Sequence, residues 1–239
     1  MIVRADGLCV GQASHAWMSG QLAEAWAWPV DRPQEAALAA LQHDVGMAEH
    51  DVRSPLLDEA TGGPVGFTAL PRALHLELWT RAPALVESQS AYAALGVSLH
   101  GTGLYARAAD DPAVAAYLEQ QRGEQERLAA VAGASAGECG RLQALLRLWD
   151  AISLSLLLGW ALAPVPVPGA AGADVVVELA DAGDGTWTLD PWPLRATELE
   201  VRCEGRRLAE PASDARALRA ALARAPRVDL RFLLRRPQP

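Results

Sequence analysis

The chain has 239 residues, of which 51% are hydrophobic and 21% are charged, a composition typical of a folded protein and not of a disordered one. Its formal net charge of −8 repels phosphate backbones and anionic lipids, so we expect neither nucleic acid nor a membrane as a partner. All 21 basic residues are arginine, which excludes mechanisms that need a Schiff-base lysine or a phosphate-loop lysine.

The cysteines and the apolar segments indicate a cytoplasmic protein. Cys9, Cys139 and Cys203 are far apart and form no CxxC pair, which argues against zinc-ribbon and thioredoxin-like sites and favours a reducing compartment. The start of the chain, "MIVRADG", lacks the layout of a secretion signal. The longest apolar stretch after Asp150 is interrupted by Pro164, so it is shorter than the roughly 20 residues that cross a bilayer.

Residues 12–162 show the apolar spacing of three and four that is typical of helices. A helix from residue 12 is followed by one that opens with Asp31 as N-cap and Pro33 in its first turn, and that ends at the pair His43-Asp44. The further expected helices cover residues 70–82, 88–101, 111–131 and 139–162. The last of these is the most apolar, so we expect it at the centre of a helical bundle.

The pattern changes after a Pro/Gly/Ala-rich stretch at residues 163–173, which we interpret as a linker. Beyond it the sequence predicts a hairpin of strands 174–180 and 186–192, a strand 198–208 with a turn at Gly205, a helix 213–224 and a last strand 228–235. The predicted fold is therefore mainly α: a helical domain at residues 1–162, the linker, and a small β-rich extension at residues 174–239. The extension contains no histidine, so histidine chemistry should lie in the helical part.

Asp150 is the most informative polar residue of the apolar helices. It lies in "LLRLWDAISLSLLLGW", where a bare buried carboxylate would cost several kcal/mol and would normally become protonated. A metal ion would remove that cost. An ion pair with Arg147, three residues earlier on the same helix, would also remove it, and both alternatives remain open.

Four further polar side chains in helices have the chemistry of metal ligands. Adjacent helical residues point about 100° apart, so His43 and Asp44 cannot both face one neighbouring helix, but both can reach an ion at the helix end. His15 lies in the first helix, and His100 lies at the expected end of another, before Gly101. Imidazole nitrogens together with carboxylate oxygens suit zinc, manganese, iron or nickel, and the absence of cysteine ligands argues against a structural zinc.

The order of these residues, His15, then His43-Asp44, then a distal Asp150, resembles the H…HD…D signature of the HD-domain metal-dependent phosphohydrolase superfamily. The segments "QASHAWMSGQLAEAW", "QHDVGM", "LGVSLHGTGLY" and "TLDPWPL" are similar, over nearly the whole chain, to an HD-like bacterial family described as a domain of unknown function. The resemblance implies a helical HD fold that binds one or two divalent ions (Mn, Fe, Zn or Ni). It implies that these four residues are core ligands, with Asp44 at the reaction centre, and that His100 is the extra ligand of two-ion members.

One residue departs from the signature, since many hydrolytic HD proteins read HDxGK or HDxGH, whereas here Met47 follows Gly46. The second pair, His50-Asp51, is a candidate for a catalytic or substrate-facing role, with the open alternative that Asp51 only caps or turns the chain. Three residues are candidates for substrate binding, although each could equally be structural or solvent-facing: Gln12, Tyr105 and Arg107. His75 has no nearby ligand partner in the sequence, and we expect it to be a helix-surface or packing residue.

The leading functional prediction is a metal-dependent phosphohydrolase, acting on a phosphomonoester or phosphodiester bond of a small phosphorylated metabolite or nucleotide. Two alternatives stay open. One is a di-iron oxygenase that uses the same ligands, and the other is a non-catalytic metal-binding or structural protein. The expected partner is a small-molecule substrate, and a homodimer is possible.

Overall fold

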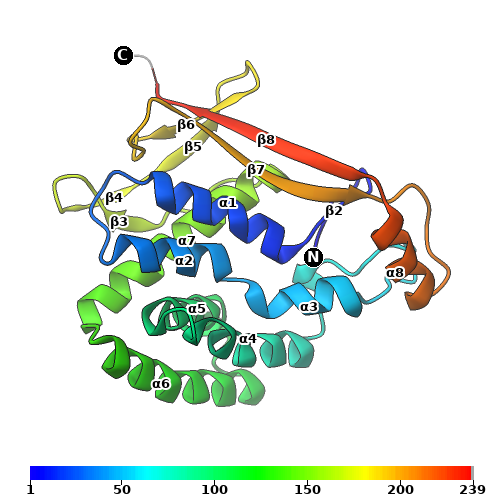
Figure 1. Ribbon diagram of the computed structural model, residues 1–239, viewed down its shortest axis with the longest axis horizontal. Coiled ribbons are helices and arrows are strands. Elements are labelled where there is room, and N and C mark those ends of the chain that lie inside the picture. Colours follow the sequence, from blue (N-terminus) through cyan, green and yellow to red (C-terminus); the bar gives the residue numbers. More distant parts are fainter. Residues whose placement is uncertain (238–239) are drawn as a thin grey trace.

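Helices occupy one side of the molecule and a curled sheet covers the other, in a computed structural model that describes residues 1–237 (Figure 1). The helices are α1 (Gln12–Ala25), α2 (Pro33–Gln42), α3 (Val45–Arg53), α4 (Arg72–Glu87), α5 (Ala91–Tyr105), α6 (Pro112–Ala132), α7 (Ala136–Leu158) and α8 (Ala215–Arg224), with 3-10 turns η1 (Phe67–Ala69) and η2 (Ala106–Ala108). No helical segment within residues 1–237 combines the length and hydropathy required to cross a bilayer.

The main sheet has the strand order β1-β2-β7-β8-β6-β5, and β3 and β4 form a separate pair. The strands are β1 (Ile2–Val3), β2 (Leu8–Val10), β3 (Pro166–Pro168), β4 (Asp174–Val176), β5 (Glu178–Asp181), β6 (Thr186–Asp190), β7 (Glu198–Arg207) and β8 (Arg227–Arg235). Strands β6 and β8 run parallel, and the other neighbours run antiparallel.

Helix α1 lies directly beneath the long strand β7 (Figure 1). Side chains alternate along β7: Val201 and Cys203 are fully buried, whereas Glu200, Arg202 and Glu204 are exposed. The Ser14 hydroxyl donates to the Glu204 carbonyl oxygen at 2.6 Å, and the Gln21 amide donates to the Arg202 carbonyl oxygen at 2.8 Å. These bonds join α1 to the sheet along its length.

Helix α7 lies at the centre of the helices, as its apolar sequence predicts, and packs against α1, α2 and α5. It begins at a capping box, in which the Ser135 hydroxyl accepts from the Glu138 backbone N–H and the Glu138 carboxylate accepts from that of Ser135. Trp149 is fully buried and packs edge-to-face on Trp26 of the α1 C-cap, with ring centroids 5.7 Å apart. This packing sets the position of the next residue, Asp150.

The sheet corrects the prediction of a mainly α bundle with a β-rich extension confined to the C-terminal part. Strands β1 and β2, from the start of the chain, pair with each other, and β2 also pairs with β7. Strand β3 lies within the predicted linker 163–173. Strands of two or three residues are too short to show an alternating pattern, which is why they were not predicted. The division into a domain 1–162 and an extension 174–239 stays a prediction, and residues 238–239 lie outside the described residues.

Two glycines that were expected to end elements lie inside them. Helix α5 continues past Gly101 to Tyr105, so His100 is not at a helix end, and β7 runs through Gly205. A Cβ at residue 101 would approach the Tyr117 hydroxyl to 2.5 Å and the Trp79 ring to 2.7 Å. Gly101 therefore serves close packing of side chains against α5, and the helix does not stop there.

Gly46, next to the ligand pair His43-Asp44, generates a prediction about stability. A Cβ at this position would lie 2.4 Å from the Leu78 carbonyl oxygen of α4, so Gly46→Ala must push α3 away from α4. We expect the free energy of unfolding to fall by about 1–3 kcal/mol, as for other overpacked sites. Urea unfolding measures it.

The matched control is Gly123→Ala, at an exposed position inside α6 where a Cβ meets nothing within 4 Å. There alanine should raise the free energy of unfolding by about 0.5–1 kcal/mol, because it lowers the backbone entropy of the unfolded chain. Equal effects of the two substitutions would contradict the close contact between α3 and α4.

Candidate metal centre

Four structural elements bring five buried histidine and aspartate side chains to one place. His15 comes from α1, His43 and Asp44 from the junction of α2 and α3, His100 from α5 and Asp150 from α7. Their exposed fractions range from 0% for His43 to 8% for Asp150. The residues predicted as metal ligands therefore form one cluster, although they are spread over most of the helical sequence.

The donor atoms of this cluster lie within a few ångströms of one another. His15 Nε2 is 2.9 Å from Asp44 Oδ2, 3.2 Å from His43 Nε2 and 3.4 Å from Asp150 Oδ1. His43 Nε2 is 3.4 Å from the same Asp150 oxygen, and His100 Nε2 is 3.9 Å from Asp150 Oδ2. Three Nε2 atoms and two carboxylates thus converge from different helices.

The outer nitrogens of two histidines are held by the protein. The His43 Nδ1–H donates to the Ala40 carbonyl oxygen at 2.8 Å. The Ser153 hydroxyl donates to the Asp150 carbonyl oxygen at 2.8 Å, so its oxygen accepts from His15 Nδ1–H, also at 2.8 Å. A neutral imidazole with its proton on Nδ1 presents a lone pair at Nε2, which is the arrangement found in metal-ligating histidines.

The pKa values of the cluster show that it favours a cation. Burial lowers the pKa of His43, but the Asp44 and Asp150 carboxylates outweigh burial and raise this pKa well above its usual value. Burial opposes ionisation of Asp44, yet His43 and His15 hold its pKa well below the ordinary range. Burial and the charge of His43 lower the pKa of His100 to about 4, so that imidazole is neutral. A proton and a metal ion compete for the same place between the carboxylates.

The spacing of the donors fits a metal ion. Donors that share one ion at about 2.0–2.2 Å are separated from each other by about 3–3.5 Å. Two overlapping groups have donor atoms within 4.8 Å of one another: His15, His43 and Asp44, and His43, His100 and Asp150. The cluster could therefore hold one ion or two, with His43 common to both groups.

The alternative of an ion pair between Asp150 and an arginine of its own helix is not realised. Arg141 bonds the Asp31 carboxylate at 2.6 Å. Within residues 1–237, the basic side chains that lie within 4 Å of Asp150 are His15, His43 and His100. The charge of the Asp150 carboxylate is therefore partnered by the histidines and not by an arginine.

The second pair, His50-Asp51, lies in α3 and does not join the cluster. Asp51 Oδ1 accepts from the Met1 ammonium group at 2.7 Å, and Oδ2 accepts from the Gln12 backbone N–H at 2.7 Å, at the start of α1. These contacts agree with the alternative prediction for Asp51, that its carboxylate caps or turns the chain. His50 is buried beside Asp51, and the catalytic assignment of this pair stays a prediction.

A cavity of about 310 Å³ adjoins the cluster and reaches His15, Asp44, His100 and Asp150. Its other walls include Gln12 and Tyr105, two of the three predicted substrate-binding residues. The Gln12 amide oxygen is buried and has no hydrogen-bond partner among residues 1–237. An unpartnered buried acceptor in a cavity wall is suited to a donor of a bound molecule.

His75 also lines this cavity. The sequence prediction of a helix-surface or packing residue did not include a place in the site. The Trp79 indole N–H donates to His75 Nε2 at 3.2 Å, so neutral His75 carries its proton on Nδ1 and donates it to the Tyr105 oxygen at 2.5 Å. Burial lowers the pKa of His75 and raises the pKa of Tyr105, which keeps both groups neutral. The Tyr105 hydroxyl proton is then left for a ligand. The sequence feature that could have indicated this arrangement is the spacing of four residues between His75 and Trp79, which places the two side chains next to each other on one helix face.

Fold and site together define an α/β protein with a buried histidine–aspartate cluster that could hold a metal ion. The family model DUF3891, described as a protein of unknown function, matches residues 1–210, and the chain belongs to this family. Neither the curated proteins nor the solved structures gave a match.

The cluster generates a prediction about metal content. We expect near-stoichiometric manganese, iron, zinc or nickel in the purified protein. Asp44→Asn keeps the size of the side chain but removes its charge, so its affinity for the metal should fall by roughly tenfold or more and its metal content should fall with it. Elemental analysis after reloading measures this. Asp110→Asn, in an exposed loop, is the control and should keep the metal. Equal metal content in Asp44→Asn and the wild type would contradict the site.

Proposed function

We propose that this protein is a metal-dependent phosphohydrolase related to the HD-domain superfamily, acting on a small phosphorylated metabolite or nucleotide. The observation that carries the proposal is the buried cluster of three histidines and two aspartates beside a cavity of about 310 Å³. Buried carboxylates and imidazoles that open onto a cavity are typical of catalytic metal sites, which keep a position free for substrate or water.

The placement of the ligands on helices supports the relation to HD proteins. The first histidine lies on α1, the adjacent pair lies where α2 ends and α3 begins, and the distal aspartate lies on the central helix α7. This is the order of the H…HD…D signature, and the pair reaches the cluster from a helix junction, where two adjacent side chains can point to one centre.

The chain has Met47 at the position where the HDxGK and HDxGH patterns have a lysine or a histidine. Its side chain is 1% exposed and packs in an apolar cluster with Leu78 and Trp79, so it does not line the cavity. A lysine or histidine here would be buried among apolar groups. Any polar contact to a phosphoryl group in this protein must therefore come from other residues, and Gln12 and Tyr105 are at hand in the cavity wall.

Different side chains have different roles in the proposed reaction. When bound, a divalent ion would activate water and polarise a phosphoryl oxygen. Asp44 and Asp150 would balance the charge of that ion, and Ser153 and the Ala40 carbonyl group orient His15 and His43. Tyr105, oriented by His75, presents a hydroxyl proton to the substrate and can donate it to the leaving oxygen.

The two overlapping donor groups favour one second candidate, a di-iron oxygenase, because such an enzyme needs two ions on mixed nitrogen and oxygen ligands. Iron as the bound metal, together with oxygen uptake and no phosphate release, would support this candidate over the phosphohydrolase.

The proposal predicts metal-dependent phosphate release. Protein loaded separately with manganese, zinc, nickel or iron should release phosphate from some members of a panel of phosphomonoesters and phosphodiesters. Asp44→Asn should reduce the rate to background, whereas Asp110→Asn should keep the wild-type rate. A panel with no turnover by any fully loaded protein would contradict the hydrolase.

A second prediction concerns Tyr105. Tyr105→Phe removes the hydroxyl proton that His75 directs, so we expect kcat to fall about a hundredfold with unchanged metal content. Tyr92→Phe is the control, since the Tyr92 hydroxyl lies on the same helix but is buried without a partner in the described chain. Unchanged kcat in Tyr105→Phe would remove Tyr105 from the reaction.

A further inference from the structure

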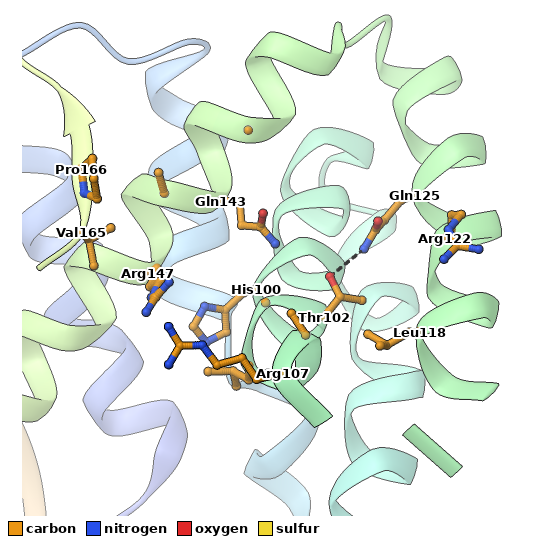
Figure 2. A pocket seen from close by; sticks show the side chains of 15 residues that line it. His100, Thr102, Arg107, Leu118, Arg122, Gln125, Gln143, Arg147, Val165 and Pro166 are labelled. Atoms are coloured by element: carbon orange, nitrogen blue, oxygen red, sulfur yellow. Dashed lines mark hydrogen bonds between the residues drawn. The ribbon is translucent and has the colours of Figure 1, made fainter. Parts of the chain in front are cut away.

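A second, larger cavity of about 770 Å³ lies next to the cluster, bordered by α5, α6, α7 and the start of β3 (Figure 2). The two cavities share His100 and Leu104 in their walls, so they are neighbours along α5. Together they have the size of a site for a metabolite with two separated groups.

The charge of the larger cavity is opposite to that of the whole chain. Arg107, Arg122 and Arg147 line it, and its described lining contains no aspartate or glutamate. The chain as a whole has 29 acidic and 21 basic residues. A concave surface that carries charge of one sign attracts ions of the opposite sign.

Two of the three arginines have no side-chain partner in the described part of the chain. Arg122 pairs with Glu119 on α6. Arg107, in η2, and Arg147, in α7, form neither an ion pair nor a side-chain hydrogen bond with any other residue of 1–237. In Figure 2 their side chains reach from different elements toward the end of the cavity where His100 lies. The two guanidinium groups therefore share one cavity without a carboxylate to neutralise either of them, which leaves both free to bind an anion.

The other polar groups of this cavity are already used within the protein. The Gln143 amide donates to the Leu99 carbonyl oxygen at 2.6 Å, and the Gln125 amide donates to the Thr102 hydroxyl at 3.0 Å (Figure 2). The strong donors that remain are therefore the two guanidinium groups, whose paired N–H groups match the oxygens of a phosphate.

We propose that the larger cavity binds a phosphate group of the substrate through Arg107 and Arg147, while a second anionic group of the same molecule lies at the histidine–aspartate cluster. The substrate is then a small molecule with two anionic groups: a phosphate held by the arginines and, under the proposed function, the phosphoester that is hydrolysed at the cluster. The assignment of the second group rests on the proposed function, whereas the arginine site rests on the cavity alone.

Isothermal titration calorimetry with inorganic phosphate tests the arginine site. The full-length chain is stripped of metal so that phosphate cannot bind an ion, and it is titrated at low ionic strength. Wild type should bind phosphate. Arg107→Gln and Arg147→Gln should each weaken binding about tenfold or more, because each removes a charged donor. Arg216→Gln, an exposed arginine on α8 without a side-chain partner in residues 1–237, is the control and should bind like wild type.

The outcomes separate the two proposals. No phosphate binding by the wild type, equal binding by all arginine variants, or equally strong binding of acetate would overturn the phosphate site. Phosphate binding that depends on Arg107 and Arg147, in a protein that holds no metal and turns over no phosphate ester, would support the arginine site and overturn the proposed hydrolase. Circular dichroism and thermal melting of each variant confirm that these exposed substitutions leave the fold intact.

Discussion

Two ionised carboxylates buried among helices are the constraint on which the rest of this structure depends. Asp44 and Asp150 are nearly inaccessible to water, and a carboxylate in such a place is costly unless a cation and hydrogen bonds surround it. The histidines supply both conditions, since they can carry a proton or bind an ion. The helices α1, α2, α5 and α7 must therefore be held in one arrangement, because a shift of any one removes a partner of a buried charge.

The sheet provides much of that rigidity. Helix α1 is fixed to β7 by hydrogen bonds from Ser14 and Gln21, which lie on either side of His15 in the sequence. At its start, Asp51 binds the Gln12 backbone N–H and so connects α1 to α3, next to the ligand pair. Because α1 is held by the sheet on one face and by α7 on another, His15 has little freedom to leave the cluster.

The sequence predicted the cluster better than it predicted the fold. Asp150 could be selected because a carboxylate inside an apolar helix needs a partner, and the pair His43-Asp44 because both side chains can reach an ion at a helix end. His15 and His100 followed from the resemblance to the HD signature, and the structure brings all five residues together. The sheet could not be derived in the same way. Strands β1 and β2 are too short to show a period. The partner of β2 in the sheet is β7, in which Arg207 faces Leu8, and a local pattern does not reveal a pairing between the two ends of the chain.

Two residues near the cluster, Asp51 and His75, also depend on long-range contacts that a local sequence pattern does not reveal. Asp51 looked like a catalytic candidate because it repeats the His-Asp pair, but its contacts are with the Met1 ammonium and a helix start, which depend on tertiary structure. His75 was assigned to packing because the role of its imidazole appears only when Tyr105, thirty residues later in the chain, is placed against it. Side chains that act through long-range partners are the ones that a single sequence leaves undetermined.

Charge is separated along α5, and this separation suggests an order of events in the proposed reaction. The carboxylates lie on one side of His100 and the unpaired arginines lie on the other, while His100 itself is neutral because its pKa is about 4. Asp44 and Asp150 alone would repel an anionic group, so the end of the substrate at the cluster is attracted only after a cation has bound there. The end at Arg107 and Arg147 is attracted in either state. A molecule with two anionic groups would therefore bind first by its phosphate in the larger cavity, and its second group would settle at the cluster only in the metal-loaded protein.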